Sequence, residues 1–172
     1  MVSTVLFNSE STVIHDRLPL ERVPHMTEAE YFPHGCTALL DAVGEAIRHI
    51  GNIHKYARAE DVPAKTLFVI TTDGYENASK YYDYEKVRKM IERQKEKYGW
   101  EFLFLGANID AAAEAKRFGI HADHAVNYKC DKRGTALNYD VISDAVCCVR
   151  SCQSLSADWK ARIDEDVRKR GK

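Results

Sequence analysis

The stretch Leu67-Phe68-Val69-Ile70-Thr71-Thr72-Asp73-Gly74 decides the fold. Its first four residues form a continuous apolar run, which is typical of a strand buried on both faces of a parallel sheet. Asp73-Gly74 has the chemistry of a turn and ends that strand. The stretch therefore predicts a buried strand with a polar loop at its carboxyl end.

The sequence downstream repeats this strand and alternates it with helices. A helix is predicted from Asp83, a favourable N-cap, to Tyr98, where Gly99 supplies the stop. The further elements are a buried strand over Phe102 to Leu105, a short alanine-rich helix from Asp110 to Gly119, and a weaker strand over Ala125 to Tyr128. This alternation predicts an α/β fold with an open, mostly parallel, Rossmann-like sheet flanked by helices.

The sequence upstream predicts a β-hairpin and one long helix. Val2 to Phe7 and Thr12 to His15 are strand-like runs joined by polar turn residues. Residues 16–36 form a long irregular connection, which is unusual in a small domain and favours a functional loop. Apolar residues then recur at helical spacing from about Ala38 to Tyr56, and Thr37 is a candidate N-cap.

Length and composition describe one domain over residues 1–172, with a helical C-terminal extension over about 134–172. The net charge of -1 gives no electrostatic case for nucleic acid or an anionic membrane as a partner. No apolar stretch approaches the ~20 residues of a membrane span, and the amino-terminal residues do not read as a signal peptide. The five cysteines are an odd number without a paired framework, so we expect reduced thiols and a cytoplasmic location.

Two segments together resemble the von Willebrand factor A (vWA) domain family. They are Gly35-Cys36-Thr37 before a helix and Thr72-Asp73-Gly74-Tyr75-Glu76-Asn77 after a strand, and the resemblance extends over about residues 2–128. In that family, such segments supply the second and third parts of a metal-ion-dependent adhesion site. The resemblance implies that Thr37 and Asp73 are metal ligands, that the metal is Mg²⁺, and that a protein partner completes the coordination through an acidic side chain.

The chemistry of these residues agrees with that expectation. A hydroxyl and a carboxylate are hard oxygen ligands of the kind that Mg²⁺ prefers. No nucleophile and base pair is visible beside them, so we expect binding without turnover. A degenerate vWA module that binds no metal is the main alternative, because Asp73-Gly74 also reads as a simple turn and Thr37 as a simple helix cap.

The chain departs from the family at its first motif. The family's D-x-S-x-S motif ends a first strand, and no such strand precedes Val2, so we expect an N-terminally incomplete vWA-like domain. Ser9 and Ser11 have the S-x-S spacing, but Phe7 stands at the place of the aspartate. With two protein ligands only, we expect Mg²⁺ binding no tighter than roughly millimolar.

The missing strand has a consequence for the sheet. In the family it lies between the strands that here are Val2 to Phe7 and Thr66 to Thr72. These two strands must therefore pair with each other or leave open hydrogen-bonding edges. Of the two, we favour open edges that form a homodimer or exchange strands between copies.

Four weaker sites complete the expectations. Cys36 and His34 could act as a thiol nucleophile and its base, which would make the protein a small thiol hydrolase. No acidic residue that would orient the histidine is apparent beside them. Three groups of side chains are weighed as other sites and interpreted as ordinary structure: Cys147, Cys148 and Cys152 for zinc, His121 and His124 for a metal, and Tyr81, Tyr82 and Tyr84 for base stacking.

Overall fold

A computed structural model of the protein describes residues 1–27, 35–151 and 155–171. The predicted α/β class is confirmed, with a parallel three-stranded sheet and a separate antiparallel hairpin. The strands of the parallel sheet lie in the order β3-β4-β5, and the hairpin is β1-β2. Their bounds are β1 Val2–Phe7, β2 Ser11–Leu18, β3 Leu67–Thr72, β4 Glu101–Gly106 and β5 Ala125–Asn127.

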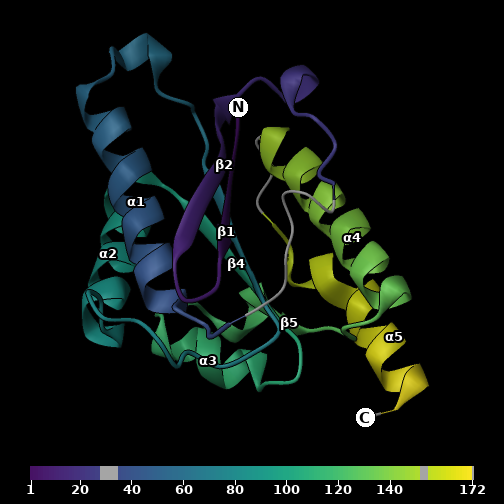
Figure 1. The fold of residues 1–172 in the computed structure, drawn as a ribbon. Coiled ribbons are helices and arrows are strands. Elements are labelled where there is room, and N and C mark those ends of the chain that lie inside the picture. Colours follow the sequence, from purple (N-terminus) through teal and green to yellow (C-terminus); the bar gives the residue numbers. More distant parts are fainter. Residues whose placement is uncertain (28–34, 152–154, 172) are drawn as a thin grey trace.

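In the described part of the chain, five α-helices flank these strands, and they divide into two groups (Figure 1). α1, α2 and α3 contribute to one hydrophobic cluster, whereas α4 and α5 contribute to a second cluster on the other face of the sheet. The bounds of the helices are α1 Leu39–Tyr56, α2 Tyr84–Tyr98, α3 Ala111–Arg117, α4 Lys132–Arg150 and α5 Ala161–Arg170.

The predicted helix signals hold at α2 and α3. The side chain of Asp83 accepts the Lys86 N–H, and Gly99 ends α2 with a φ of 64° that favours glycine. Asp110 accepts the N–H of Ala113 in the same way at the start of α3. These caps fix where each helix leaves the carboxyl end of its preceding strand.

Other boundaries differ from the sequence expectation. β2 continues to Leu18 beyond the predicted His15, so regular structure takes the first residues of the connection expected to be irregular. Residues 28–34 of that connection lie outside the described part. α4 begins at Lys132, capped by Asp131, slightly before the predicted start. Among the described residues, no helix is long and apolar enough to cross a membrane.

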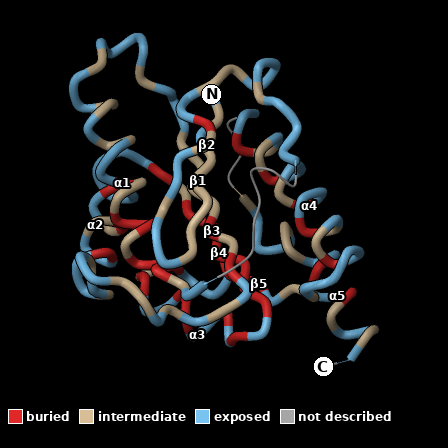
Figure 2. Tube along the Cα trace, in the orientation of Figure 1, coloured by how far each residue is buried: buried red, intermediate tan, exposed pale blue. Residues whose placement is uncertain are grey.

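The side chains of β3 alternate between the two clusters. Phe68 and Ile70 belong to the face covered by α1 and α2, whereas Leu67 and Val69 pack against the face covered by α4. β4 alternates in the same way and carries fully buried residues on both faces, as the concentration of buried chain at the sheet in Figure 2 shows. The prediction of strands buried between two layers of helices is correct for β4 and partly met by β3, whose residues are mostly half-buried.

Direct pairing of the first strand with β3 does not occur. β1 is hydrogen-bonded to β2 and β3 to β4, and no described strand joins the hairpin to the parallel sheet. Of the two outcomes expected for these strands, the described structure therefore has the open edges and not the closed sheet.

Candidate functional site

The candidate site lies where β3 ends, at the edge of the sheet from which α1 also starts. The chain leaves β3 through Asp73 and runs as an irregular loop to Asp83, the cap of α2. The amino terminus of α1 is bonded to this loop at several points. The carboxyl ends of parallel strands are the usual position of ligand sites in open α/β sheets, which makes this edge the first place to look.

Thr37 lies directly against the loop after β3. Its backbone N–H donates to Asn77 Oδ1 at 2.8 Å, and its carbonyl oxygen accepts the Asn77 N–H at 3.0 Å. A Cβ atom placed on Gly74 would lie 3.5 Å from Thr37 Oγ1. The structure thus brings the Thr37 hydroxyl beside the residue that follows Asp73.

The expectation that Thr37 caps α1 is wrong. The N-cap position is Ala38, and no side chain at that position caps the helix. Glu76 and Ser79 take over the role from the other side, because Glu76 Oε2 accepts the Leu40 N–H at 2.8 Å and Ser79 Oγ accepts the N–H of Asp41 at 3.0 Å. The Thr37 hydroxyl is therefore not used as a helix cap.

Two buttressing carboxylates, Glu76 and Asp41, hold the loop and the helix together. Glu76 also accepts the N–H groups of Ala78 and Ser79 and the Ser79 hydroxyl. Asp41 accepts the N–H groups of three consecutive residues, Lys80, Tyr81 and Tyr82. Every carboxylate oxygen of the pair is thus engaged with the protein itself.

The electrostatics of this pair follow from its hydrogen bonds. Burial raises the pKa of Glu76, but the donors from Leu40, Ser79 and Ala78 outweigh burial and hold that pKa below its ordinary value. Burial likewise raises the pKa of Asp41, and three backbone N–H groups lower it again, to below the usual value. Both side chains are thus anions that fix the loop rather than ligands free to bind a metal.

Asp73 differs from both of them. Its side chain is exposed, and it makes no hydrogen bond or ion pair with the described residues. The hydroxyl of the preceding Thr72 is turned inward, where it donates to the Gly74 carbonyl oxygen at 2.9 Å. Asp73 is therefore an exposed carboxylate available to a ligand, one residue before the Gly74 that lies beside the Thr37 hydroxyl.

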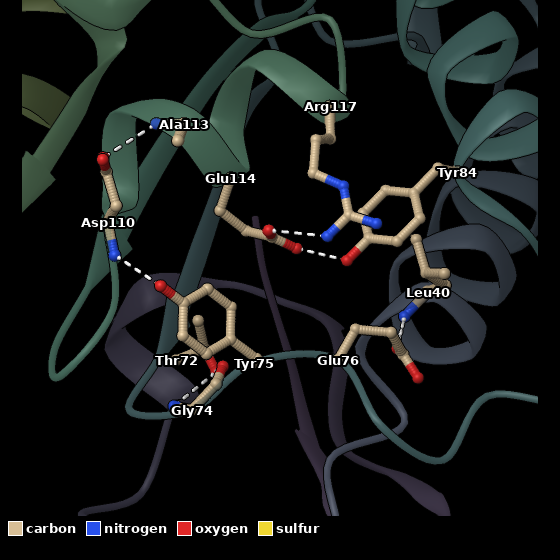
Figure 3. Close-up of polar contacts among 10 residues, drawn as sticks. All are labelled: Leu40, Thr72, Gly74, Tyr75, Glu76, Tyr84, Asp110, Ala113, Glu114 and Arg117. Carbon is tan, nitrogen blue, oxygen red and sulfur yellow. Dashed lines mark hydrogen bonds and ion pairs between the residues drawn. The ribbon is translucent and has the colours of Figure 1, made fainter.

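Tyr75 joins this loop to the next one along the sheet edge (Figure 3). Its hydroxyl accepts the N–H of Asp110 at 3.1 Å, and Asp110 is the residue that caps α3. Figure 3 also shows Glu76 reaching the opposite way, to Leu40 at the start of α1. The loop after β3 is thus anchored on both of its sides.

The two serines considered as substitute ligands are separated by their partners. Ser9 Oγ accepts the Cys36 N–H at 3.2 Å, so it lies beside the segment that carries Thr37. The Ser11 hydroxyl donates to Glu45 Oε2 at 2.8 Å, on α1. Ser9 and Ser11 therefore do not act as a pair, and Ser9 alone lies near the candidate site.

Cys130 is a neighbour of the site that the sequence reasoning missed. Cys130 is exposed as a residue, yet partial burial of its thiol raises the pKa, and the carboxylates of Asp73 and Asp131 raise it further. The residue follows β5, and the loops after parallel strands share one edge of the sheet. This rule is the signal by which the sequence could have pointed to Cys130.

Tyr84 of α2 and Glu114 and Arg117 of α3 form a polar cluster around the buried Glu114 carboxylate (Figure 3). Glu114 is 2% exposed, accepts the hydroxyl of Tyr84, and pairs with Arg117 at 3.1 Å. The guanidinium carbon of Arg117 lies 3.4 Å from the centre of the Tyr84 ring. Burial, followed by the Glu114 carboxylate, raises the pKa of Tyr84, so its phenol stays protonated and donates to Glu114.

The tyrosines considered for base stacking do not form a platform. The Tyr84 hydroxyl donates to Glu114 in this polar cluster, and Tyr82 packs against the backbone of Gly44 on α1, where a Cβ atom would come within 2.4 Å of its ring. Only Tyr81 of the three is strongly exposed, at 72%. The interpretation of these side chains as ordinary structure is supported for Tyr82 and Tyr84.

The structure does not support the remaining weaker sites. His34 and Cys152 lie outside the described residues, and Cys36 and Cys147 are exposed. His121 is paired with its neighbour Asp123 at 3.1 Å rather than with His124. Within the described ranges, no group of three or more histidine, cysteine, aspartate or glutamate side chains is arranged to hold a metal ion.

The side chains of Thr37 and Asp73 at this sheet edge are of the kind that binds Mg²⁺, but two ligand groups are too few for a complete Mg²⁺ site. Thr37 and Asp73 offer two hard oxygen atoms, and Mg²⁺ commonly binds proteins through one or two carboxylates while keeping several waters. The buttressing carboxylates are already engaged, so they add no ligand. Comparison with known proteins adds nothing to this geometry, since no family model, curated protein or solved structure matches the chain.

Proposed function

We propose that this protein is a non-enzymatic interaction module of the vWA type, in which Thr37 and Asp73 hold Mg²⁺ weakly for an acidic side chain of a protein partner. The observation that carries the proposal is the position of the Thr37 hydroxyl beside Gly74, next to an exposed aspartate. Neither oxygen is consumed by a helix cap, since Glu76 and Ser79 cap α1 instead.

The rigidity of the loops supports the same function. An open metal position is useful for recognition only if its ligands stay in place when the partner is absent. Glu76, Asp41 and Tyr75 fix the loop on both sides through short hydrogen bonds. Two protein ligands then leave most of the Mg²⁺ shell to water, and one of those waters is the group that a partner's carboxylate replaces.

Titration with Mg²⁺ tests the proposal. We expect isothermal calorimetry, or amide chemical shifts of residues 35–38 and 72–77, to give a dissociation constant of roughly millimolar or weaker. Asp73→Asn and Thr37→Val each remove one ligand group, so each weakens binding further. Asp61→Asn, an exposed aspartate in the turn Ala59–Asp61 after α1, is the matched control and leaves the titration unchanged.

Two results would count against this account. A titration without any shift at residues 72–77 favours the alternative, a degenerate module that binds no metal. Micromolar affinity that is lost in Asp73→Asn would require a third protein ligand, and Ser9→Ala would then identify the hydroxyl beside the Thr37 segment as that ligand.

A further inference from the structure

We infer that the open edge of β3 is a docking site for an extended segment of another polypeptide that is apolar on both of its faces and adds a strand to the sheet. This inference does not depend on metal binding at Asp73. It starts from the backbone of β3, which is paired along one side only in the described structure.

The register of the sheet identifies the unpaired groups. The N–H of Glu101 donates to Thr66 O and the N–H of Ala107 to Thr72 O, with Phe68 opposite Phe102 and Ile70 opposite Phe104. In a parallel ladder, alternate residues turn both N–H and C=O to the same neighbour. The even-numbered residues of β3 therefore bond to β4, and Leu67, Val69 and Thr71 turn their backbone groups to the open side.

Apart from these unpaired backbone groups, β3 has the surroundings of a strand in the interior of a sheet. Leu67 and Val69 pack against the cluster under α4, and Phe68 against the cluster under α1 and α2. A strand at this edge will place its own side chains alternately on the same two clusters. The occupant is therefore a segment of about six residues, apolar at successive positions, because helices cover both faces of the sheet.

The position of the β1-β2 hairpin near β3 favours a single extended strand as the occupant of the open edge. Phe7 of β1 packs against the same cluster as Phe68, and β1 also has one side without a described partner strand. The Ala38 N–H donates to Asn8 O and the Asn77 N–H to Thr37 O, so the hairpin and the loop after β3 meet at one segment. This neighbourhood favours an extended segment over the broad face of a second folded copy.

A peptide binding experiment tests the inference. The probe is the acetylated and amidated peptide Lys-Thr-Leu-Phe-Val-Ile-Thr-Thr-Asp, which copies residues 65–73 and is apolar on both faces with polar ends. A fluorescent version is held at low concentration and titrated with the whole protein. We expect saturable binding, with slower amide hydrogen exchange at Leu67, Val69 and Thr71 in the complex.

Two controls separate strand pairing from simple hydrophobic adhesion. The first is a pair of peptides that are N-methylated at alternate residues, one for each edge of the strand, and at least one of them should bind at least tenfold more weakly. The second is Val69→Pro, which removes an N–H that β4 does not use and should weaken binding at least tenfold. If Val69→Pro does not fold, Thr71→Pro takes its place, and the exchange data on the wild-type protein remain decisive.

Three results would overturn the inference. The first is no binding by the parent peptide, and the second is equal binding by the parent and both methylated peptides. The third is a dimer in light scattering whose Leu67, Val69 and Thr71 amides are already protected, because the occupant is then a second copy of this chain.

Discussion

β3 and β4 are neighbouring strands of similar sequence that have different surroundings. Both carry an apolar run, both are covered by helices on two faces, and both end at the same edge of the sheet. β4 is paired on both sides and is almost wholly buried, whereas β3 is paired on one side and is mostly half-buried. The difference teaches that the sequence of β3 is suited to two neighbours, while the described structure supplies one.

The same contrast extends to the loops that follow the two strands. After β4, Ala107 and Ile109 are buried and Asp110 is engaged as the cap of α3. After β3, Asp73 is exposed, and the next residue, Gly74, lies beside the Thr37 hydroxyl. Both proposals, the metal-dependent contact and the added strand, therefore concern the β3 side of the molecule.

The largest effect is expected when matched leucines are shortened in the two strands. Leu103 of β4 is fully buried and Leu67 of β3 is half-buried, and both pack against the cluster under α4. We expect Leu103→Ala to lower the free energy of unfolding by about 2–5 kcal/mol, and Leu67→Ala by about 1–2 kcal/mol. Urea denaturation measures both values. Equal losses would show that the β3 face is as well packed as the β4 face.

A smaller effect is expected at Glu76, one of the two buttressing carboxylates of the loop after β3. Glu76→Gln removes the charge that accepts hydrogen bonds from Leu40, Ala78 and Ser79, and we expect a loss of about 1–2 kcal/mol at neutral pH after solvent screening. The pKa of Glu76 is lowered in the folded protein, so its stabilisation is present above the ordinary glutamate pKa and is lost as the pH falls through the lower, folded value.

The control for this prediction is the exposed Glu60→Gln, which should change stability little at any pH. Urea denaturation of wild type and Glu76→Gln across a pH series should show two curves that converge as the pH falls below the ordinary glutamate pKa and through the lower pKa of folded Glu76. A constant difference between the curves at low pH would mean that the charge of Glu76 does not fix the loop.

The smallest effect is expected at Cys130. The Asp73 carboxylate contributes to the raised pKa of this thiol, after burial, so Asp73→Asn should lower the pKa and increase the thiolate fraction. We expect alkylation of Cys130 at mildly alkaline pH to accelerate by less than about threefold. Peptide-resolved mass spectrometry separates this thiol from those of Cys36 and Cys147, which are also exposed and whose rates serve as internal references. An unchanged or slower rate would contradict an influence of the Asp73 carboxylate on the pKa of Cys130.

Much of this fold was predictable because its signals are local. The apolar runs of β3 and β4 and the caps Asp83 and Asp110 are short patterns that the structure reproduces. The cap of α1 was not predictable in this way. Glu76 reaches Leu40 from 36 residues along the chain, and a contact of that kind follows from tertiary packing rather than from local sequence.

In the candidate site, too, the features that local sequence predicts differ from those that depend on tertiary contacts. Thr37 and Asp73 were identified from the two motifs that resemble the vWA family. Three features of the site depend on contacts between residues far apart in the sequence. These are the Thr37 hydroxyl that does not cap α1, the different partners of Ser9 and Ser11, and the electrostatic interaction of Asp73 with Cys130. Metal binding itself stays a prediction.

Amide hydrogen exchange along β3 tests the central claim, that this strand has one open edge. In a protein shown to be monomeric by light scattering, we expect the Phe68 and Ile70 amides to exchange as slowly as those of Leu103 and Leu105. The amides of Leu67, Val69 and Thr71 should exchange at least about a hundredfold faster. Equal protection of all five β3 amides in the monomer would show that the edge is already covered and would contradict the account.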